Sequence, residues 1–158
     1  MEKLKELVKK ANQHLKTADH LTYVTYPLVK DIKLLLNIIE NLNKSMTLGM
    51  EAVLRYDKLF KRISPYPDNF EAKFLVFQKS SVMRHAIKGE QVSLIEELNN
   101  IINKHKQSPM VFQRKDKLVI SNHNYRLKTL TIEDVKRYLP NAKLFIFKVN
   151  NILKDYVR

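Results

Sequence analysis

Residues 28–62, LVKDIKLLLNIIENLNKSMTLGMEAVLRYDKLFKR, carry the longest helical pattern in the chain. Apolar side chains recur there every three or four positions, which lines them up on one face of a helix. This stripe comprises Leu28, Ile32, Leu35, Ile39, Leu42, Met46, Val53, Tyr56 and Phe60. A second apolar flank widens it, so we expect a central helix that is covered on several sides. As one unbroken helix, this stretch would be about 52 Å long, whereas a globule of this size has a diameter of about 39 Å. The excess length predicts either a bend near 45–49 or a protruding end.

Amphipathic helices are also predicted on both sides of this stretch. The first spans about 2–24, and the segment 23–27 ends or kinks it because Pro27 lacks a backbone donor. The segment SPYPDN at 64–69 is a clear break. A third helix follows over about 70–88, with Gly89 as its C-terminal cap, and a fourth over about 90–105.

The apolar period changes after Pro109. Segments 110–114, 117–120 and 125–130 alternate as short strands do, with turns at 115–116 and 122–124. Two closing helices, 131–139 and 142–156, are separated at Pro140. The predicted fold is mainly α: a helical bundle of about five to six helices with a small antiparallel β-meander, at about 110–130, before the last helices. We expect a single domain over 1–158, with the bundle at 1–106, the meander at 110–130 and the closing helices at 131–158.

The composition excludes several classes of site. The 158 residues include no cysteine and two glycines. Thiol nucleophiles, cysteine zinc sites and glycine-rich phosphate loops are therefore excluded. No apolar run is long enough to span a membrane, and the chain starts without the apolar core of a signal peptide. We expect a cytoplasmic protein without a membrane, metal or cofactor partner and without predicted catalytic residues.

Charge is the strongest functional indication. The chain has 29 Lys and Arg against 16 Asp and Glu, a net charge of +13. Residues 111–158 hold 11 basic and 4 acidic residues, so more than half of the excess lies in the last third. Such a density attracts polyanions, because each phosphate that is neutralised releases condensed counterions. A solvated surface that only keeps the protein soluble is the alternative interpretation.

The predicted nucleic-acid interface is a cationic ribbon over 104–128, where seven bases accompany one acid, Asp116. Phosphate contacts are assigned to Arg114, Lys115, Lys117, Arg126 and Lys128, with Lys104 and Lys106 on the flank. Tyr125 and His123 are the candidates for base contacts. These assignments predict a non-enzymatic nucleic-acid-binding protein that prefers RNA to DNA.

Two other functions stay open. The apolar stripe over 28–63 is wide enough for a protein-interaction or homodimerisation module. Alternatively, His123 or His105 beside Arg114 or Arg126 would provide acid–base cleavage of RNA, because imidazole titrates near neutrality. His14 and His20 lie six residues apart on the first helix, a spacing that does not suit a shared metal ligand set.

Two stretches resemble the HEPN superfamily of helical-bundle proteins. One is ANQHLKTADHL at 11–21, before a long apolar helix, and the other is AKLFI at 142–146 with Val149 and Ile152. The resemblance implies an up-and-down bundle, homodimerisation, and RNA or nucleotides as ligands. Catalytic members carry an arginine followed by a histidine after four to six intervening residues. Here Arg84 and His85 are adjacent, and eight residues separate Arg114 from His123.

Overall fold

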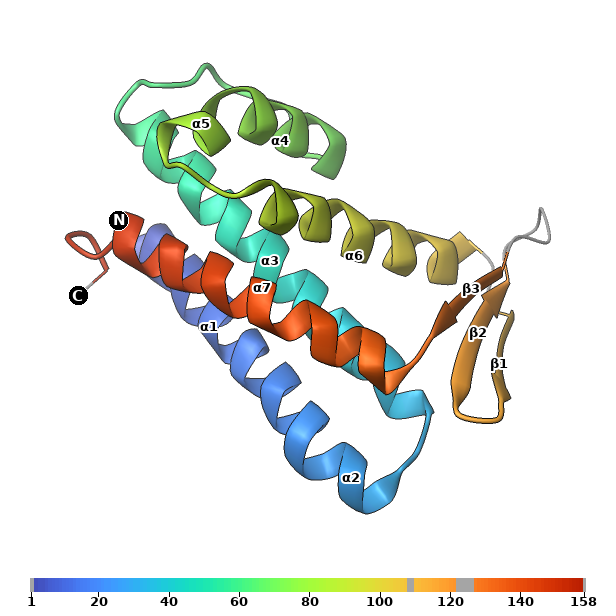
Figure 1. The fold of residues 1–158 in the computed structure, drawn as a ribbon. Coiled ribbons are helices and arrows are strands. Elements are labelled where there is room, and N and C mark those ends of the chain that lie inside the picture. The colour runs from blue at the N-terminus through green and yellow to red at the C-terminus, as the bar shows by residue number, and fades with distance from the viewer. Residues whose placement is uncertain (1, 108–109, 122–126, 158) are drawn as a thin grey trace.

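The chain is mostly helical in its computed structural model, which describes residues 2–107, 110–121 and 127–157 (Figure 1). The helices are α1 Glu2–His20, α2 Tyr26–Val29, α3 Lys33–Leu59, α4 Phe70–Val76, α5 Val82–Arg84, α6 Gly89–Gln107 and α7 Ile132–Ile152. Two π-helical turns, η1 Leu21–Thr25 and η2 Phe77–Ser81, join α1 to α2 and α4 to α5. The strands are β1 Met110–Arg114, β2 Lys117–Ser121 and β3 Leu127–Leu130. The predicted fold class, a helical bundle with a small antiparallel meander, is confirmed.

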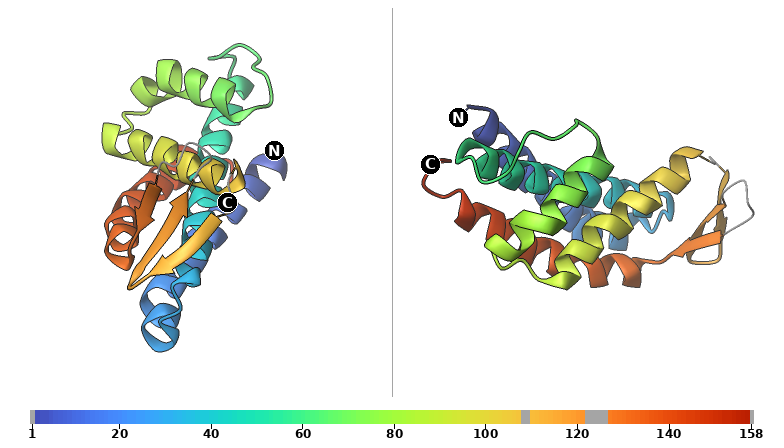
Figure 2. Two further views of the ribbon diagram at one scale, coloured as in Figure 1. Left: turned by 90° about the vertical axis from the view of Figure 1, so that its right-hand side faces the viewer. Right: turned by 90° about the horizontal axis from the view of Figure 1, so that it is seen from above.

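Helix α3 forms the centre of the bundle. It packs against α1, α7 and α6, and the α4–η2–α5 segment covers its C-terminal half (Figures 1 and 2). The Ser45 hydroxyl donates to the Ala11 carbonyl oxygen at 2.7 Å, a direct bond between α3 and α1. The sheet lies at the end of the bundle opposite the start of α1 (Figure 1). Within the described residues, no helix is long and apolar enough to cross a membrane.

The long helix is shorter than predicted. It begins at Lys33, because Lys30 adopts a left-handed conformation (φ 52°) that interrupts the pattern after α2. Leu28, expected in the buried stripe, lies in α2 and is 81% exposed. The 27 residues of α3 give a length of about 40 Å, close to the width of a globule of this size. The helix is continuous over 45–49, where a bend was one of the two predicted alternatives.

Pro27 and Pro140 both lie inside helices, α2 and α7. The π-turn η1 precedes Pro27, and its wider backbone lets α1 continue into α2 without a gap. The prediction of two closing helices separated at Pro140 is wrong, because α7 contains that residue in its interior. Pro140 is exposed while Leu139 and Ala142 are buried on either side of it. Packing on the buried side keeps the helix together where the proline removes a hydrogen bond.

The cap predicted at Gly89 is also wrong. The helical segment ends at Arg84, and Ala86 adopts the left-handed conformation (φ 54°) that reverses the chain. The Ile87 N–H then donates to the Val82 carbonyl oxygen at 2.9 Å, as in a helix C-cap. Gly89 instead begins α6.

The three strands form an antiparallel sheet in the order β1-β2-β3. Arg114 pairs with Lys117 across the β1–β2 turn, which the sequence predicted at 115–116, and Lys115 has a φ of 56° there. Leu118, Ile120 and Leu130 are buried and join the sheet to the helical core.

Gly49 lies where α3 packs tightly against α7. A Cβ atom at this position would lie 3.0 Å from both the Phe145 ring and the Ile146 side chain. Both neighbours are buried in the core, so neither can turn away into solvent. A larger residue would push the two helices apart.

We therefore expect Gly49→Leu to lower the free energy of unfolding by about 2 kcal/mol through overpacking. Gly89 has nothing within 4 Å of its ideal Cβ position and provides the matched control. Gly89→Leu should change the unfolding free energy by less than about 0.5 kcal/mol. Urea titration followed by circular dichroism measures both, and equal stability of the two variants would contradict the close α3–α7 contact.

Candidate functional site

A buried carboxylate marks the C-terminal end of α3. Asp57 follows Val53 by four positions and Leu54 by three, so its side chain lies on the apolar face of the helix. Its exposed fraction is 0%. An ionised group without contact to water is costly unless it is paired and hydrogen-bonded, and Asp57 has four polar partners.

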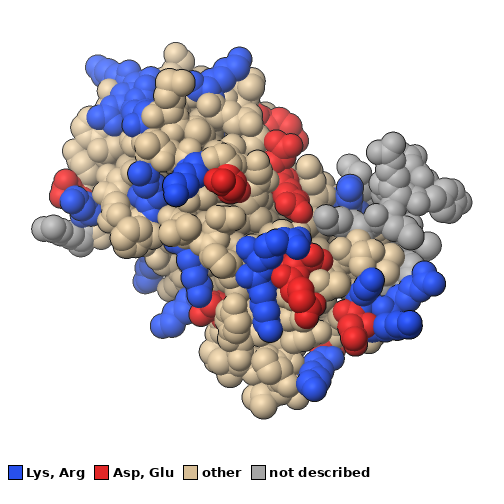
Figure 3. All heavy atoms as spheres, in the orientation of Figure 1, with Lys and Arg blue, Asp and Glu red and all other residues tan. Residues whose placement is uncertain are grey.

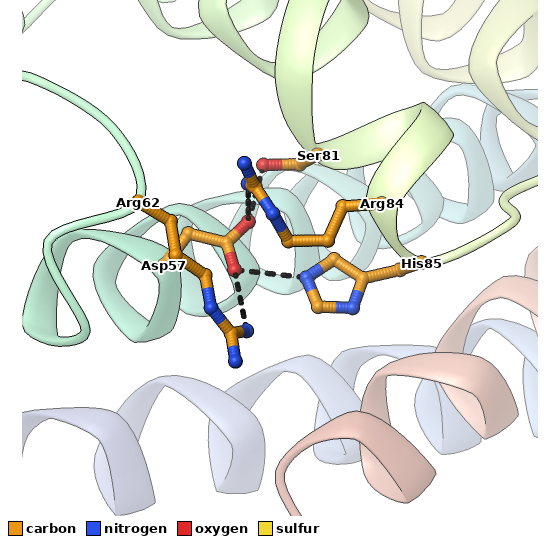
Figure 4. Close-up of polar contacts among 5 residues, drawn as sticks. All are labelled: Asp57, Arg62, Ser81, Arg84 and His85. Atoms are coloured by element: carbon orange, nitrogen blue, oxygen red, sulfur yellow. Dashed lines mark hydrogen bonds and ion pairs between the residues drawn. The ribbon is translucent and has the colours of Figure 1, made fainter.

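The partners approach the carboxylate from two segments (Figure 4). The Ser81 hydroxyl donates to Oδ2 of Asp57 at 2.6 Å, and Nη1 of Arg84 lies 3.3 Å from the same oxygen. Nε2 of His85 lies 2.9 Å from Oδ1, and Nη1 of Arg62 lies 3.5 Å from that oxygen on the other side. We call these five residues the Asp57 cluster.

Local sequence explains why these partners converge. Ser81, Arg84 and His85 have the spacing i, i+3, i+4, which puts them on one side of the turn formed by η2 and α5. Arg62 comes back to Asp57 because Lys61 reverses the chain after α3 with a φ of 58°. The Arg62 N–H also donates to the Asp57 carbonyl oxygen at 2.9 Å.

The cluster keeps Asp57 ionised. Burial by itself would raise the pKa of this carboxyl group. Hydrogen bonds from His85 and Ser81, together with electrostatic attraction to His85 and Arg84, outweigh burial and hold the pKa below its ordinary value of 3.8. One negative charge therefore faces two permanent positive charges.

The two arginines of the cluster reach solvent. The side chain of Arg62 is 39% exposed and that of Arg84 is 31% exposed. A guanidinium group has five N–H donors, and each of these two directs one nitrogen to Asp57. Donors therefore remain for an anion at the surface.

Aromatic rings lie beside these cations. Tyr56, Phe60 and Tyr156 pack together with ring centroids 4.9 to 5.6 Å apart. The Arg62 guanidinium lies 5.2 Å from the Phe60 ring centroid and 5.6 Å from that of Tyr56. Phe60 is 41% exposed.

We call this surface, comprising Tyr56, Phe60, Arg62, Arg84 and Tyr156, the helix-end surface. Lys and Arg side chains gather in the same part of the molecule, at upper left in Figure 3, where Figure 1 shows the end of α3. The helix-end surface combines cations with an exposed ring.

The structure brings only part of the predicted ribbon together. Arg114, Lys115 and Lys117 are exposed at the β1–β2 turn. Lys104 and Lys106 lie in the last turn of α6, which precedes the opposite end of β1. These two lysines therefore flank the other end of the sheet.

Lys104 has an acidic neighbourhood. It lines a cavity of about 270 Å³ together with Glu96 and Glu97, between α6 and α4. His123, Tyr125 and Arg126 lie outside the described residues, as does the side chain of Lys128, whose backbone is in β3. Their predicted contacts stay predictions, as does RNA cleavage by His123 or His105.

Sequence reasoning missed the Asp57 cluster. Asp57 was part of the long predicted helix, but no partner was assigned to it. An acidic residue on the apolar face of a helix is the indication that could have been used, because such a group needs cationic partners. The SxxRH spacing at 81–85 is the second indication, since it gathers a hydroxyl donor, a guanidinium group and an imidazole.

Comparison with known proteins gives no family for this chain. No protein-family model matches it, and no curated protein sequence matches it. Within the described residues, no group of three His, Asp or Glu side chains is placed to hold a metal ion.

Asp57→Asn should lower the free energy of unfolding by about 3 kcal/mol, because the cluster loses its only negative charge. The pKa of Asp57 is lowered by folding, so its contribution is complete above the ordinary value of 3.8 and is lost as the pH falls through the folded-state pKa. The gap between wild type and variant should be constant above about pH 5 and narrow below about pH 4.

Chemical denaturation across this pH range measures the gap. Asp155→Asn, a change at an exposed acid near the C-terminus, is the control and should cost less than about 0.5 kcal/mol at every pH. An equally small effect of Asp57→Asn would show that the buried pairing contributes nothing to stability.

Proposed function

We propose that this chain is a non-enzymatic nucleic-acid-binding protein that prefers RNA. The helix-end surface is the observation that carries the proposal. There Arg62 and Arg84 have N–H groups left over from the buried carboxylate, beside the exposed ring of Phe60. Single strands are commonly held by cations on the backbone phosphates and aromatic rings under the bases.

The same combination supports binding of an unpaired strand, the form in which RNA is most often recognised. Stacking on Phe60 requires an unpaired base, and proteins that read RNA sequence mostly bind loops, bulges and single-stranded ends. The total charge of +13 supports the phosphate contacts at longer range.

The sheet supports a second contact on a longer RNA. Arg114, Lys115 and Lys117 are exposed at the β1–β2 turn. The sheet and the helix-end surface lie near opposite ends of α3 (Figure 1), so an RNA that contacts both must span about 40 Å. The sheet turn would add phosphate contacts.

The dimerisation alternative has lost its supporting observation. Leu35, Ile39, Leu42 and Met46 of the apolar stripe are all 0% exposed within a single chain. This central part of the stripe is covered by α1, α6 and α7, whereas Leu28 and Phe60 at its two ends are exposed. A homodimer therefore stays a prediction, and the buried centre of the stripe does not support it.

For the wild type, we expect binding to a short single-stranded RNA that weakens steeply between 50 and 200 mM salt. Phe60→Ala should weaken this binding about tenfold, the loss of one stacked base. Phe147→Ala is the matched control, because Phe147 is a 64% exposed phenylalanine on α7. Fluorescence anisotropy with the RNA measures all three proteins.

Two outcomes would contradict the proposal. Weak binding that is the same for RNA, DNA and other polyanions would reduce the net charge to a solubility feature. An equal effect of Phe60→Ala and Phe147→Ala would remove the helix-end surface from the binding site.

Charge reversal at the sheet turn tests the second contact. The double variant Lys115→Glu, Lys117→Glu should weaken binding to an RNA that is long enough to reach both surfaces. The slope of log affinity against log salt concentration should fall by the amount that corresponds to about two lost phosphate contacts. An RNA too short to span the molecule should bind the double variant with nearly unchanged affinity. Equal losses for the two RNA lengths would place the primary site at the sheet.

A further inference from the structure

A cleft of about 580 Å³ lies beside the helix-end surface, on another side of the end of α3. It is formed by the last turns of α3, the connection over 60–69 and the first half of α4. Its volume is in the range of small-molecule sites, which is larger than a bare phosphate needs. Four cations line it: Arg55, Lys58, Lys61 and Lys73.

Two carboxylates in the cleft are already paired. Glu51 accepts from Nε of Arg55 at 3.3 Å and lies 3.7 Å from Nζ of Lys73. The same Lys73 ammonium lies 2.7 Å from Oδ1 of Asp68. Lys73 therefore bridges both acids, and Arg55 binds one of them.

The two remaining lysines lack a carboxylate partner. Among the described residues, no Asp or Glu oxygen lies within 4 Å of the Lys58 or Lys61 ammonium group. Both lysines are exposed, and they leave the cleft with two positive charges in excess. This excess suits a dianionic phosphate or two successive backbone phosphates.

An aromatic ring completes the cleft. Tyr66 packs against the core with part of its surface still exposed, and Nζ of Lys58 lies 5.6 Å from its ring centroid. Leu59 adds an apolar wall and is 53% exposed. A flat ring beside unpaired ammonium groups suits a planar base that carries a phosphate.

We propose that this cleft binds a nucleoside phosphate, with its phosphate on Lys58 and Lys61 and its base against Tyr66. That this nucleotide belongs to an RNA strand rests on the proposed function. A base can enter the cleft only when it is unpaired, so the cleft selects single-stranded over duplex RNA. The site would thereby supply the strand selectivity that phosphate contacts alone lack.

The cleft is tested with two variants. One combines Lys58→Gln with Lys61→Asn, since asparagine tolerates the left-handed conformation at 61. The other is Tyr66→Leu, which keeps apolar bulk but removes the ring. The double variant Lys33→Gln, Lys44→Gln is the charge-matched control, because both lysines are exposed on the distant part of α3.

The probes are adenosine monophosphate, a single-stranded RNA and a duplex RNA of equal length. Tyr66→Leu should weaken binding to the single strand and to adenosine monophosphate about tenfold and leave the duplex affinity unchanged. The lysine variant should weaken binding to the single strand and to adenosine monophosphate by at least about tenfold. The control variant should bind all three probes like the wild type. Thermal unfolding confirms that each variant is folded at the assay temperature.

The outcomes separate the cleft from the proposed function. If the wild type binds RNA and both cleft variants bind it equally well, the cleft assignment is overturned and the function stands. If no RNA binds but adenosine monophosphate binds through Lys58 and Tyr66, the cleft is supported and the RNA function is overturned. If neither probe binds at 50 mM salt, both are overturned.

Discussion

The buried carboxylate of Asp57 constrains the whole end of the bundle where α3 finishes. Its four partners come from two segments, so satisfying one charge fixes both the chain reversal after α3 and the η2–α5 turn above it. Each segment contains a non-glycine residue in the left-handed region, Lys61 and Ala86. That conformation costs about 1–2 kcal/mol per residue. The reversal at Lys61 returns Arg62 to Asp57, and Ala86 directly follows His85, the last of the three partners on the other segment. The shape of the helix-end surface follows from this one carboxylate.

The fold class could be predicted because spacing alone identifies helices and strands. Apolar residues every three or four positions marked the helices, and alternation marked the sheet, including its first turn. Where the prediction was wrong, tertiary packing overruled a local rule. Pro140 lies on the exposed side of α7 while Leu139 and Ala142 hold the helix in the core, so its missing N–H causes no break. The helix cap that was predicted at Gly89 is formed at Ala86 instead.

The candidate site was less predictable. Charges were counted in consecutive residues, whereas the fold brings together charged residues that are far apart in the sequence. Segment 104–128 has the densest bases, but its lysines divide between the two ends of the sheet. The Asp57 cluster joins residues 24 and 28 positions apart, a separation that no local pattern encodes. The acid on the apolar face of α3 showed that a partner was needed, and only the fold shows which segment supplies it.

Preorganisation distinguishes the helix-end surface from the sheet turn as a place to bind a polyanion. Lysines on an exposed turn lose rotamer freedom when they contact phosphate, and this loss weakens binding. Arg62 and Arg84 are already held by Asp57, so much of that entropy is lost on folding. A planar guanidinium can bond the carboxylate on one edge and an anion on another, which an ammonium group cannot do with fixed geometry. The interaction that stabilises this end of the bundle thus also orients the cations toward a ligand.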